Sequence, residues 1–166
     1  MRKAFLLVAI CVALTFSTSC KREKRPDGMP DIYPCSIRVV QDGKPLADAE
    51  IAIVSSDPQI ARFPCGGITD ANGIAELKTM TFKGAPKGSF KVVVSKVEWI
   101  NRPSSYEEAQ KNQSEGIKEE SYDLVDRKYG DSSTTPLKIE IQENALEPIE
   151  IDVGEAVRVS REDLMR

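Results

Sequence analysis

The chain contains no histidine among its 166 residues. This absence excludes catalytic triads that use histidine, imidazole general bases and zinc sites with histidine ligands. Aromatic residues make up only 6% of the chain, with a single tryptophan. Positive charge is not in excess either, because 23 basic residues stand against 26 acidic ones. Nucleic-acid binding requires clustered positive charge, so the sequence predicts no nucleic-acid partner.

Long apolar runs are confined to the N-terminal segment. Arg2 and Lys3 precede an apolar run over residues 4–16, and small residues lead up to Cys20. This pattern is typical of a secretory signal peptide, and the run is too short to span a bilayer comfortably. The segment resembles a bacterial lipoprotein signal, which implies removal of residues 1–19, lipidation of Cys20 and attachment to the envelope membrane. Cleavage without lipidation and retention as a short membrane anchor are the alternatives.

The cysteine count fits an exported protein. Of four cysteines, Cys11 leaves with the signal peptide and Cys20 takes the lipid. Cys35 and Cys65 remain as an even pair in an oxidising compartment, which predicts a disulfide. The alternative is two buried thiols that pack as small apolar side chains. Two thiols without histidine do not make a metal site, so we expect neither metal nor cofactor.

Apolar residues alternate with polar ones in several short segments that are separated by turn residues. This period of two is typical of strands with one buried face. The segments lie near residues 35–40, 49–53, 74–77, 90–94, 137–141 and 149–153. The pattern predicts an all-β fold over residues 32–156: an antiparallel two-sheet Greek-key sandwich of about seven strands.

Three further segments lack this alternation of apolar and polar residues. Residues 20–31 are polar and charged, which predicts a flexible tether behind the lipid. Residues 98–135 form a long polar insertion before the last two strands, with a helix expected to start after Ser105 as its cap. Residues 157–166 form a tail in which a short helix is expected. No pattern in the sequence predicts an oligomeric state.

Three motifs appear in the order found in one family. Residues 42–51 (DGKPLADAEI) and 67–75 (GITDANGIA) resemble two hairpins of the carboxypeptidase regulatory-like domains, and residues 86–94 resemble a strand of those domains. These domains belong to the transthyretin-like (prealbumin-like) β-sandwiches. Residues 128–137 are similar to a stretch of small bacterial envelope lipoproteins. The resemblance implies the transthyretin-like fold in an envelope lipoprotein, and it implies no ligand.

The sequence carries no complete catalytic set, and we predict a non-enzymatic binding or structural accessory module. It would be lipid-anchored in the bacterial envelope, on the outer membrane, facing the periplasm or the outside. One alternative is a lipoprotein that binds carbohydrate or peptide through aromatic residues, with an envelope protein or a glycan as partner. Another is a hydrolase that uses carboxylates only. The candidate binding surface comprises Trp99, Tyr106, Tyr122 and Tyr129, and the competing interpretation is that these residues fix the insertion onto the sandwich.

Overall fold

A computed structural model describes residues 24–143 and 147–162. The predicted signal peptide and the predicted lipidation at Cys20 lie outside these residues. Within them, no helix is long and apolar enough to cross a membrane.

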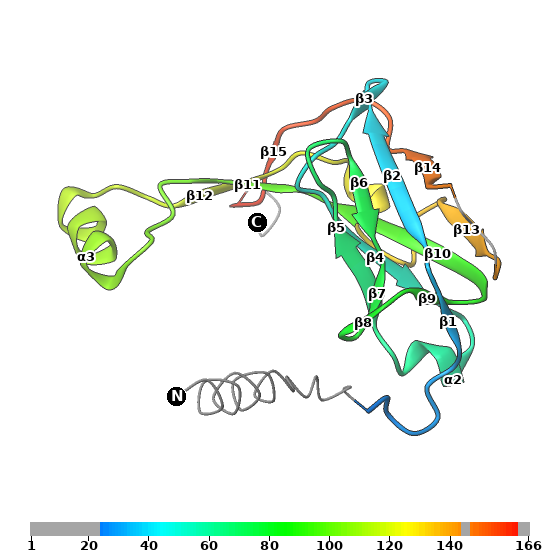
Figure 1. Ribbon diagram of the computed structural model, residues 1–166. Coiled ribbons are helices and arrows are strands. Elements are labelled where there is room, and N and C mark those ends of the chain that lie inside the picture. Colours follow the sequence, from blue (N-terminus) through cyan, green and yellow to red (C-terminus); the bar gives the residue numbers. More distant parts are fainter. Residues whose placement is uncertain (1–23, 144–146, 163–166) are drawn as a thin grey trace, which may run out of the picture.

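Two sheets form the body of the protein (Figure 1). The larger sheet is antiparallel and contains, in spatial order, β13 (Lys138–Ile141), β10 (Gly88–Ser95), β4 (Glu50–Val54), β5 (Cys65–Ile68), β7 (Lys78–Thr79) and β8 (Phe82–Lys83). The smaller sheet contains β14 (Ile149–Asp152), β2 (Ser36–Gln41) and β3 (Lys44–Pro45), and β6 (Ile74–Glu76) also pairs with β2. A separate short pair joins β1 (Ile32–Tyr33) to β9 (Ala85–Pro86), and the short helix α2 (Pro58–Ala61) follows β4.

Alternation along the strands builds the core. In β2, Ile37 and Val39 are fully buried, whereas their neighbours Ser36 and Arg38 are only partly covered. The inner faces of both sheets bring their aliphatic side chains into one cluster, as expected when each sheet hides its apolar face against the other. This cluster includes Ile37, Val39, Ile51, Ile53, Phe90, Val92, Val94, Ile139, Ile141 and Ile151.

The predicted all-β sandwich is confirmed, with two differences in detail. The described residues contain more than seven strands, and six of these strands have only two residues each. In addition, β14 pairs with β2 in parallel, with Ile151 opposite Val39. The predicted hairpin at residues 42–43 is present: Asp42 and Gly43 both have positive φ, 51° and 70°, as a tight two-residue turn requires.

Leu77 marks the place where the chain changes sheets. The strands on either side of it, β6 and β7, belong to different sheets. The Leu77 amide donates to the Cys35 carbonyl at 3.0 Å, and its own carbonyl accepts from the Gly84 amide at 2.8 Å. Its side chain is 1% exposed. A strand that passes from one sheet to the other in this way closes a corner of the sandwich.

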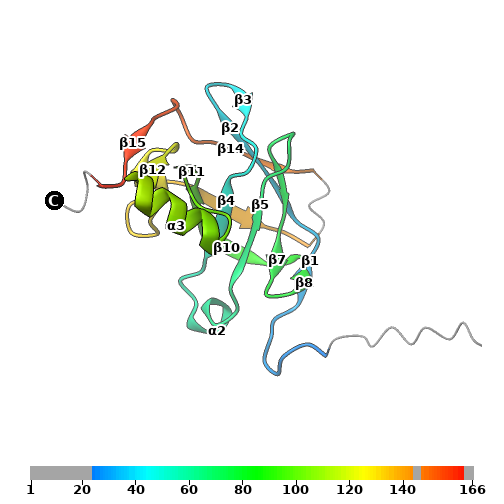
Figure 2. The same cartoon turned by 90° about the vertical axis from the view of Figure 1, so that its left-hand side faces the viewer.

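The insertion forms an arm that projects from the sandwich. Strand β10 continues past Lys96 into β11 (Val97–Ile100), which pairs with β12 (Glu120–Asp123), and β12 pairs with β15 (Val159–Ser160). The helix α3 (Tyr106–Glu115) lies at the far tip of the arm. In Figure 2 the arm points toward the viewer, and α3 lies in front of the sandwich.

Local capping, and not core packing, holds α3 together. As predicted, Ser105 caps its N-terminus, where the Ser105 hydroxyl accepts from the Glu108 amide at 3.2 Å. Gly116 ends the helix with a φ of 70°, and no residue of the helix is buried. The tip of the arm is therefore an exposed polar helix with no contact to the core.

The root of the arm is attached to the sandwich by hydrogen bonds. The Gln41 side chain, which is buried at the end of β2, donates to the Leu124 carbonyl at 2.9 Å. The Leu124 amide donates to the Lys96 carbonyl at 2.9 Å. The tail adds β15 to the arm sheet. A short helix was expected in the tail, residues 157–166, of which residues 163–166 lie outside the described part of the chain.

Candidate functional site

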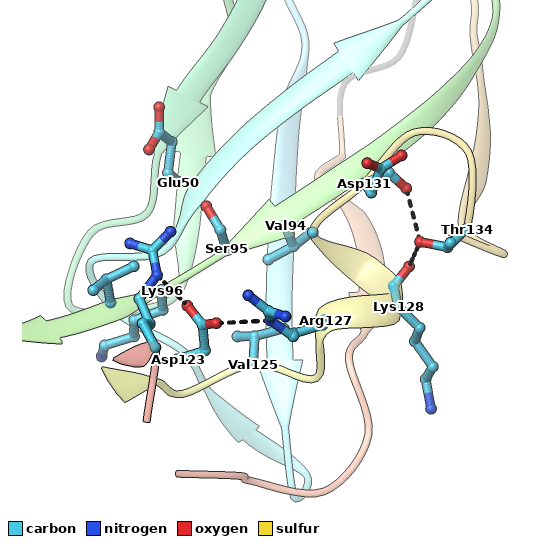
Figure 3. Close-up of a pocket in the computed structure, with 13 residues that line it drawn as sticks. Glu50, Val94, Ser95, Lys96, Asp123, Val125, Arg127, Lys128, Asp131 and Thr134 are labelled. Carbon is cyan, nitrogen blue, oxygen red and sulfur yellow. Dashed lines mark hydrogen bonds and ion pairs between the residues drawn. The ribbon is translucent and has the colours of Figure 1, made fainter. Parts of the chain in front are cut away.

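A cleft of about 670 Å³ lies at the root of the arm. One wall comes from β10 and the residues that follow it, including Ser95 and Lys96. The other wall comes from residues 123–134, which include a 3-10 turn at Arg127–Tyr129, and from Arg161 in the tail. Figure 3 shows Asp123 next to Arg127 on one side of the cleft and Asp131, Thr134 and Lys128 on the other. With Glu50 of β4, the cleft thus combines four parts of the chain that are distant in sequence.

Asp123 holds two arginines in the cleft. Arg127 Nε donates to Asp123 Oδ2 at 3.2 Å, and Arg161 Nε lies 3.3 Å from Asp123 Oδ1. The Asp123 side chain is only 15% exposed, whereas the two arginines are about half exposed. Among the described residues, the Nη groups of both guanidiniums have no recorded partner. Two guanidiniums that share one carboxylate leave a net positive charge and free donors facing the cleft.

The other charged groups of the cleft are fixed or nearly balanced. Lys96 Nζ donates to the Ala47 carbonyl at 2.8 Å. Asp131 accepts from both the hydroxyl and the amide of Ser133 at 2.6 Å, and these hydrogen bonds lower the pKa of Asp131. Glu50 lies at the opposite side of the cleft. Asp131 is therefore held as a carboxylate, and both oxygens of Asp123 are engaged by arginine.

The arm presents one face that leads into this cleft. The register places Val97 opposite Asp123, Trp99 opposite Ser121, and Asp123 opposite Val159. Paired residues share a face of a sheet, so all of these side chains lie on the side that carries Arg161. Trp99 is 43% exposed and Val159 is 39% exposed. We call this surface, from Trp99 to the two arginines, the arm face.

Trp99 is held in position by a neighbouring cation. The guanidinium of Arg102 lies 4.6 Å from the centre of the Trp99 ring. Such a contact is attractive because the ring face carries negative partial charge, and it restricts the motion of the indole. Trp99 is thus an exposed aromatic side chain whose ring face contacts a guanidinium.

The structure separates the four predicted aromatic residues. Tyr122 lies on the opposite side of the arm sheet from Trp99, where the Arg158 guanidinium stacks 3.6 Å from its ring centre. Tyr106 lies on α3 at the tip and is 77% exposed. Tyr129 is buried in the core, as the interpretation of a fixing role requires. These four residues therefore do not form one surface, and only Trp99 lies on the arm face.

The predicted disulfide between Cys35 and Cys65 is not formed. Both are buried free thiols. Cys65 Sγ lies 4.0 Å from the Gly84 carbonyl oxygen, toward which the thiol can donate. Burial, with a smaller contribution from Cys65, raises the pKa of Cys35 to about 11, and burial also raises the pKa of Cys65. The alternative interpretation, two buried thiols that pack as small apolar groups, describes this structure.

Sequence reasoning missed the residues that define the cleft. Asp123 and Arg127 look like ordinary charges of a polar insertion, and Arg161 lies in the tail. The sequence offered no clear signal for this pair, because Asp123 ends a strand and Arg127 begins a 3-10 turn, so their spacing of four residues is not that of a helix. Across the described residues, no three cysteine, aspartate or glutamate side chains lie close enough to hold a metal ion.

Comparisons with known proteins give no relative for this chain. No family model, no curated protein and no solved structure matches it.

Proposed function

We propose that the protein is a non-enzymatic binding module of the bacterial cell envelope, anchored by lipid on Cys20, and that the arm face is its binding surface. The observation that carries the proposal is the pair of arginines that Asp123 holds at the cleft beside an exposed Trp99. Aromatic and arginine side chains dominate the energetics of protein recognition sites. The sandwich would be of the transthyretin-like type, which the motifs at residues 42–51 and 67–75 support.

The chemistry of the arm face favours a protein segment with an acidic group. A carboxylate of the partner would accept from the unpaired Nη groups of Arg127 and Arg161, and bidentate pairing with guanidinium is strong and directional. An apolar or aromatic side chain of the same segment would pack on Trp99 and Val159. The projecting arm gives such a partner access without a clash with the sandwich.

The state of two of the three cleft carboxylates, Asp123 and Asp131, supports a role other than catalysis; Glu50 is the third. A hydrolase that uses carboxylates alone needs one acid that keeps its proton at working pH. The pKa of Asp131 is lowered, and Asp123 is bound by two guanidiniums. Both groups are better suited to positioning charges than to giving and taking protons.

The direct test compares binding by three purified variants. Envelope extract is passed over the immobilised chain, and the retained protein is identified and then titrated against each variant. We expect Trp99→Ala and Arg161→Gln each to weaken binding about tenfold or more, and Ile68→Ala to leave it unchanged. Ile68 is a matched control because it is an exposed apolar residue on β5, outside the arm face. Equal binding by all three variants would contradict the proposal.

Glycan binding is the second candidate, and exposed Trp99 favours it because sugar rings stack on indole. A glycan array with the wild-type chain and Trp99→Ala distinguishes the two. Binding to neutral glycans that is lost in Trp99→Ala and kept in Arg161→Gln would favour the glycan, since a neutral sugar does not need the arginine pair.

A further inference from the structure

Two lysines stand directly opposite each other on the outer surface of the larger sheet. Lys91 in β10 is paired with Lys138 in β13. Their neighbours Phe90 and Ile139 are also paired and are buried, so both lysines point outward. Like charges directly opposite across two strands are destabilising. The pairing therefore costs stability unless an anion lies between the two ammonium groups.

A groove of about 470 Å³ lies at this pair. None of the carboxylates in the described part of the chain lines it. Apart from the lysines, Val54 and Phe90, its wall is made of serines: Ser55, Ser56, Ser89 and Ser132. Serine hydroxyls donate hydrogen bonds readily to an anion. The groove shares no lining residue with the cleft at the arm root.

The two lysines differ in how they are held. Lys91 Nζ donates to the Ser132 carbonyl at 2.7 Å, which fixes its position and leaves other N–H donors for a ligand. Lys138 has no recorded partner among the described residues and is exposed. Lys91 also contributes to the lowered pKa of Asp131, but Asp131 is bound by the Ser133 hydroxyl and amide. Glu140, opposite Ser89, is on the same outer face as the two lysines but does not line the groove. The lysines that line the groove therefore leave it with positive charge.

We propose that this groove binds a phosphate group, with Lys91 and Lys138 on opposite sides and the serine hydroxyls completing the hydrogen bonds. A tetrahedral oxyanion has enough acceptor oxygens for both ammonium groups and for the hydroxyls together. The apolar surface of Val54, which is 37% exposed, would contact the organic part of a phosphate ester. The groove would then act as a site for free phosphate, for a sugar phosphate or for a lipid headgroup.

The first experiment is an NMR or calorimetric titration of the purified chain with inorganic phosphate and with glucose 6-phosphate. The second measures sedimentation of the chain with vesicles that contain phosphatidylglycerol. We expect saturable binding of at least one of these, and a loss of about tenfold in affinity for Lys138→Gln, because hydrogen bonds to charged groups are among the stronger ones. Affinity for inorganic phosphate and for glucose 6-phosphate should rise between about pH 5 and pH 7.5, since the second ionisation of a phosphate monoester lies near pH 6. The phosphodiester of phosphatidylglycerol has no second ionisation, so binding to the vesicles should show no such rise. The ligand that binds most tightly among inorganic phosphate, glucose 6-phosphate and the vesicles identifies the source of the phosphate.

Lys83→Gln is the matched control. Lys83 is also an exposed lysine of the larger sheet, but it is paired with Glu76 at 3.3 Å. An equal loss of affinity in Lys83→Gln and Lys138→Gln would mean a nonspecific effect of net charge and would overturn the proposal. Absence of binding to inorganic phosphate, to glucose 6-phosphate and to the vesicles would also overturn the proposal. Neither result bears on the arm face, which these variants leave intact.

Discussion

Asp123 and Arg161 meet at 3.3 Å although one residue ends a strand of the arm and the other lies in the C-terminal tail. The pair lies beside the backbone bond from the Arg161 amide to the Ser121 carbonyl at 3.0 Å. Together these contacts fasten the tail to β12 and complete the three-stranded arm sheet. The cleft exists because the tail returns to the arm root.

Removal of the Asp123 carboxylate should loosen the arm root. In Asp123→Ala, the guanidiniums of Arg127 and Arg161 lose their shared partner and repel each other. We expect the free energy of unfolding to fall by about 1–3 kcal/mol, since hydrogen bonds to charged groups contribute in this range. Urea denaturation measures the change. Glu76→Ala is the control, because it breaks an exposed ion pair that should contribute less than about 0.5 kcal/mol. Equal effects of the two substitutions would count against this role of Asp123.

Thr69 should be essential for the turn that follows β5. Its buried hydroxyl donates to the Leu46 carbonyl at 2.7 Å and accepts from the Ala49 amide at 2.8 Å. Thr69→Val keeps the shape but leaves two buried backbone groups without these partners, which should cost about 2–4 kcal/mol. Thr69→Ser retains the hydroxyl and should lose much less. Thermal unfolding measures the stability of both variants. Equal stability of Thr69→Val and Thr69→Ser would contradict this role of the Thr69 hydroxyl.

Gly66 should tolerate no side chain. A Cβ at this position would collide with the Ile51 carbonyl oxygen on the neighbouring strand. The backbone of a paired strand cannot move aside as a flexible side chain can, so Gly66→Ala should cost about 2–4 kcal/mol. Gly130→Ala is the control, because its Cβ would lie 3.4 Å from the nearest atom, the Arg127 carbonyl oxygen. Similar denaturation midpoints for both variants would show that the strands separate more easily than the structure implies.

The buried thiols should react slowly in the folded protein. Burial raises the pKa of both cysteines, to about 11 for Cys35, so little thiolate is present at about pH 8. We expect iodoacetamide to modify Cys35 and Cys65 only after denaturation, as peptide mapping would show. Rapid alkylation of the folded chain would contradict the burial.

The same thiols give stability a pH dependence in the alkaline range. A raised pKa in the folded state means that the unfolded chain releases its thiol protons first as the pH rises. The contribution of Cys35 to stability is therefore complete below about pH 9 and is lost as the pH approaches 11. Denaturation midpoints measured across this range should fall for the wild-type chain and fall less for Cys35→Ala.

The sequence was sufficient to predict most of the strands that line the core, but not β5, whose sequence Cys-Gly-Gly-Ile has no apolar alternation. Alternation in β2, β4, β10, β13 and β14 is strong because each of these strands buries one face. Strands β11 and β12 were not predicted, because the arm stands away from the core and neither of its faces needs a continuous apolar stripe. Helix α3 was predictable from Ser105, since a capping residue acts locally.

The candidate site was mostly beyond sequence reasoning. Trp99 was identified by its type alone, whereas the position of Arg161 depends on how the tail returns to β12. Tyr129 was placed in the candidate binding surface because it lies in a polar insertion. It is buried instead, because residues 124–135 fold back against the sandwich. Contacts between segments that are distant in sequence leave no local pattern.

The most direct test of the arm face places a photo-crosslinking amino acid at position 99 in the full-length chain expressed in bacterial cells, with position 68 as the exposed control. The account predicts one discrete crosslinked species from position 99, its loss when Arg161→Gln is added, and none from position 68. Crosslinking of equal yield from both positions, or a product from position 99 that Arg161→Gln does not reduce, would contradict it.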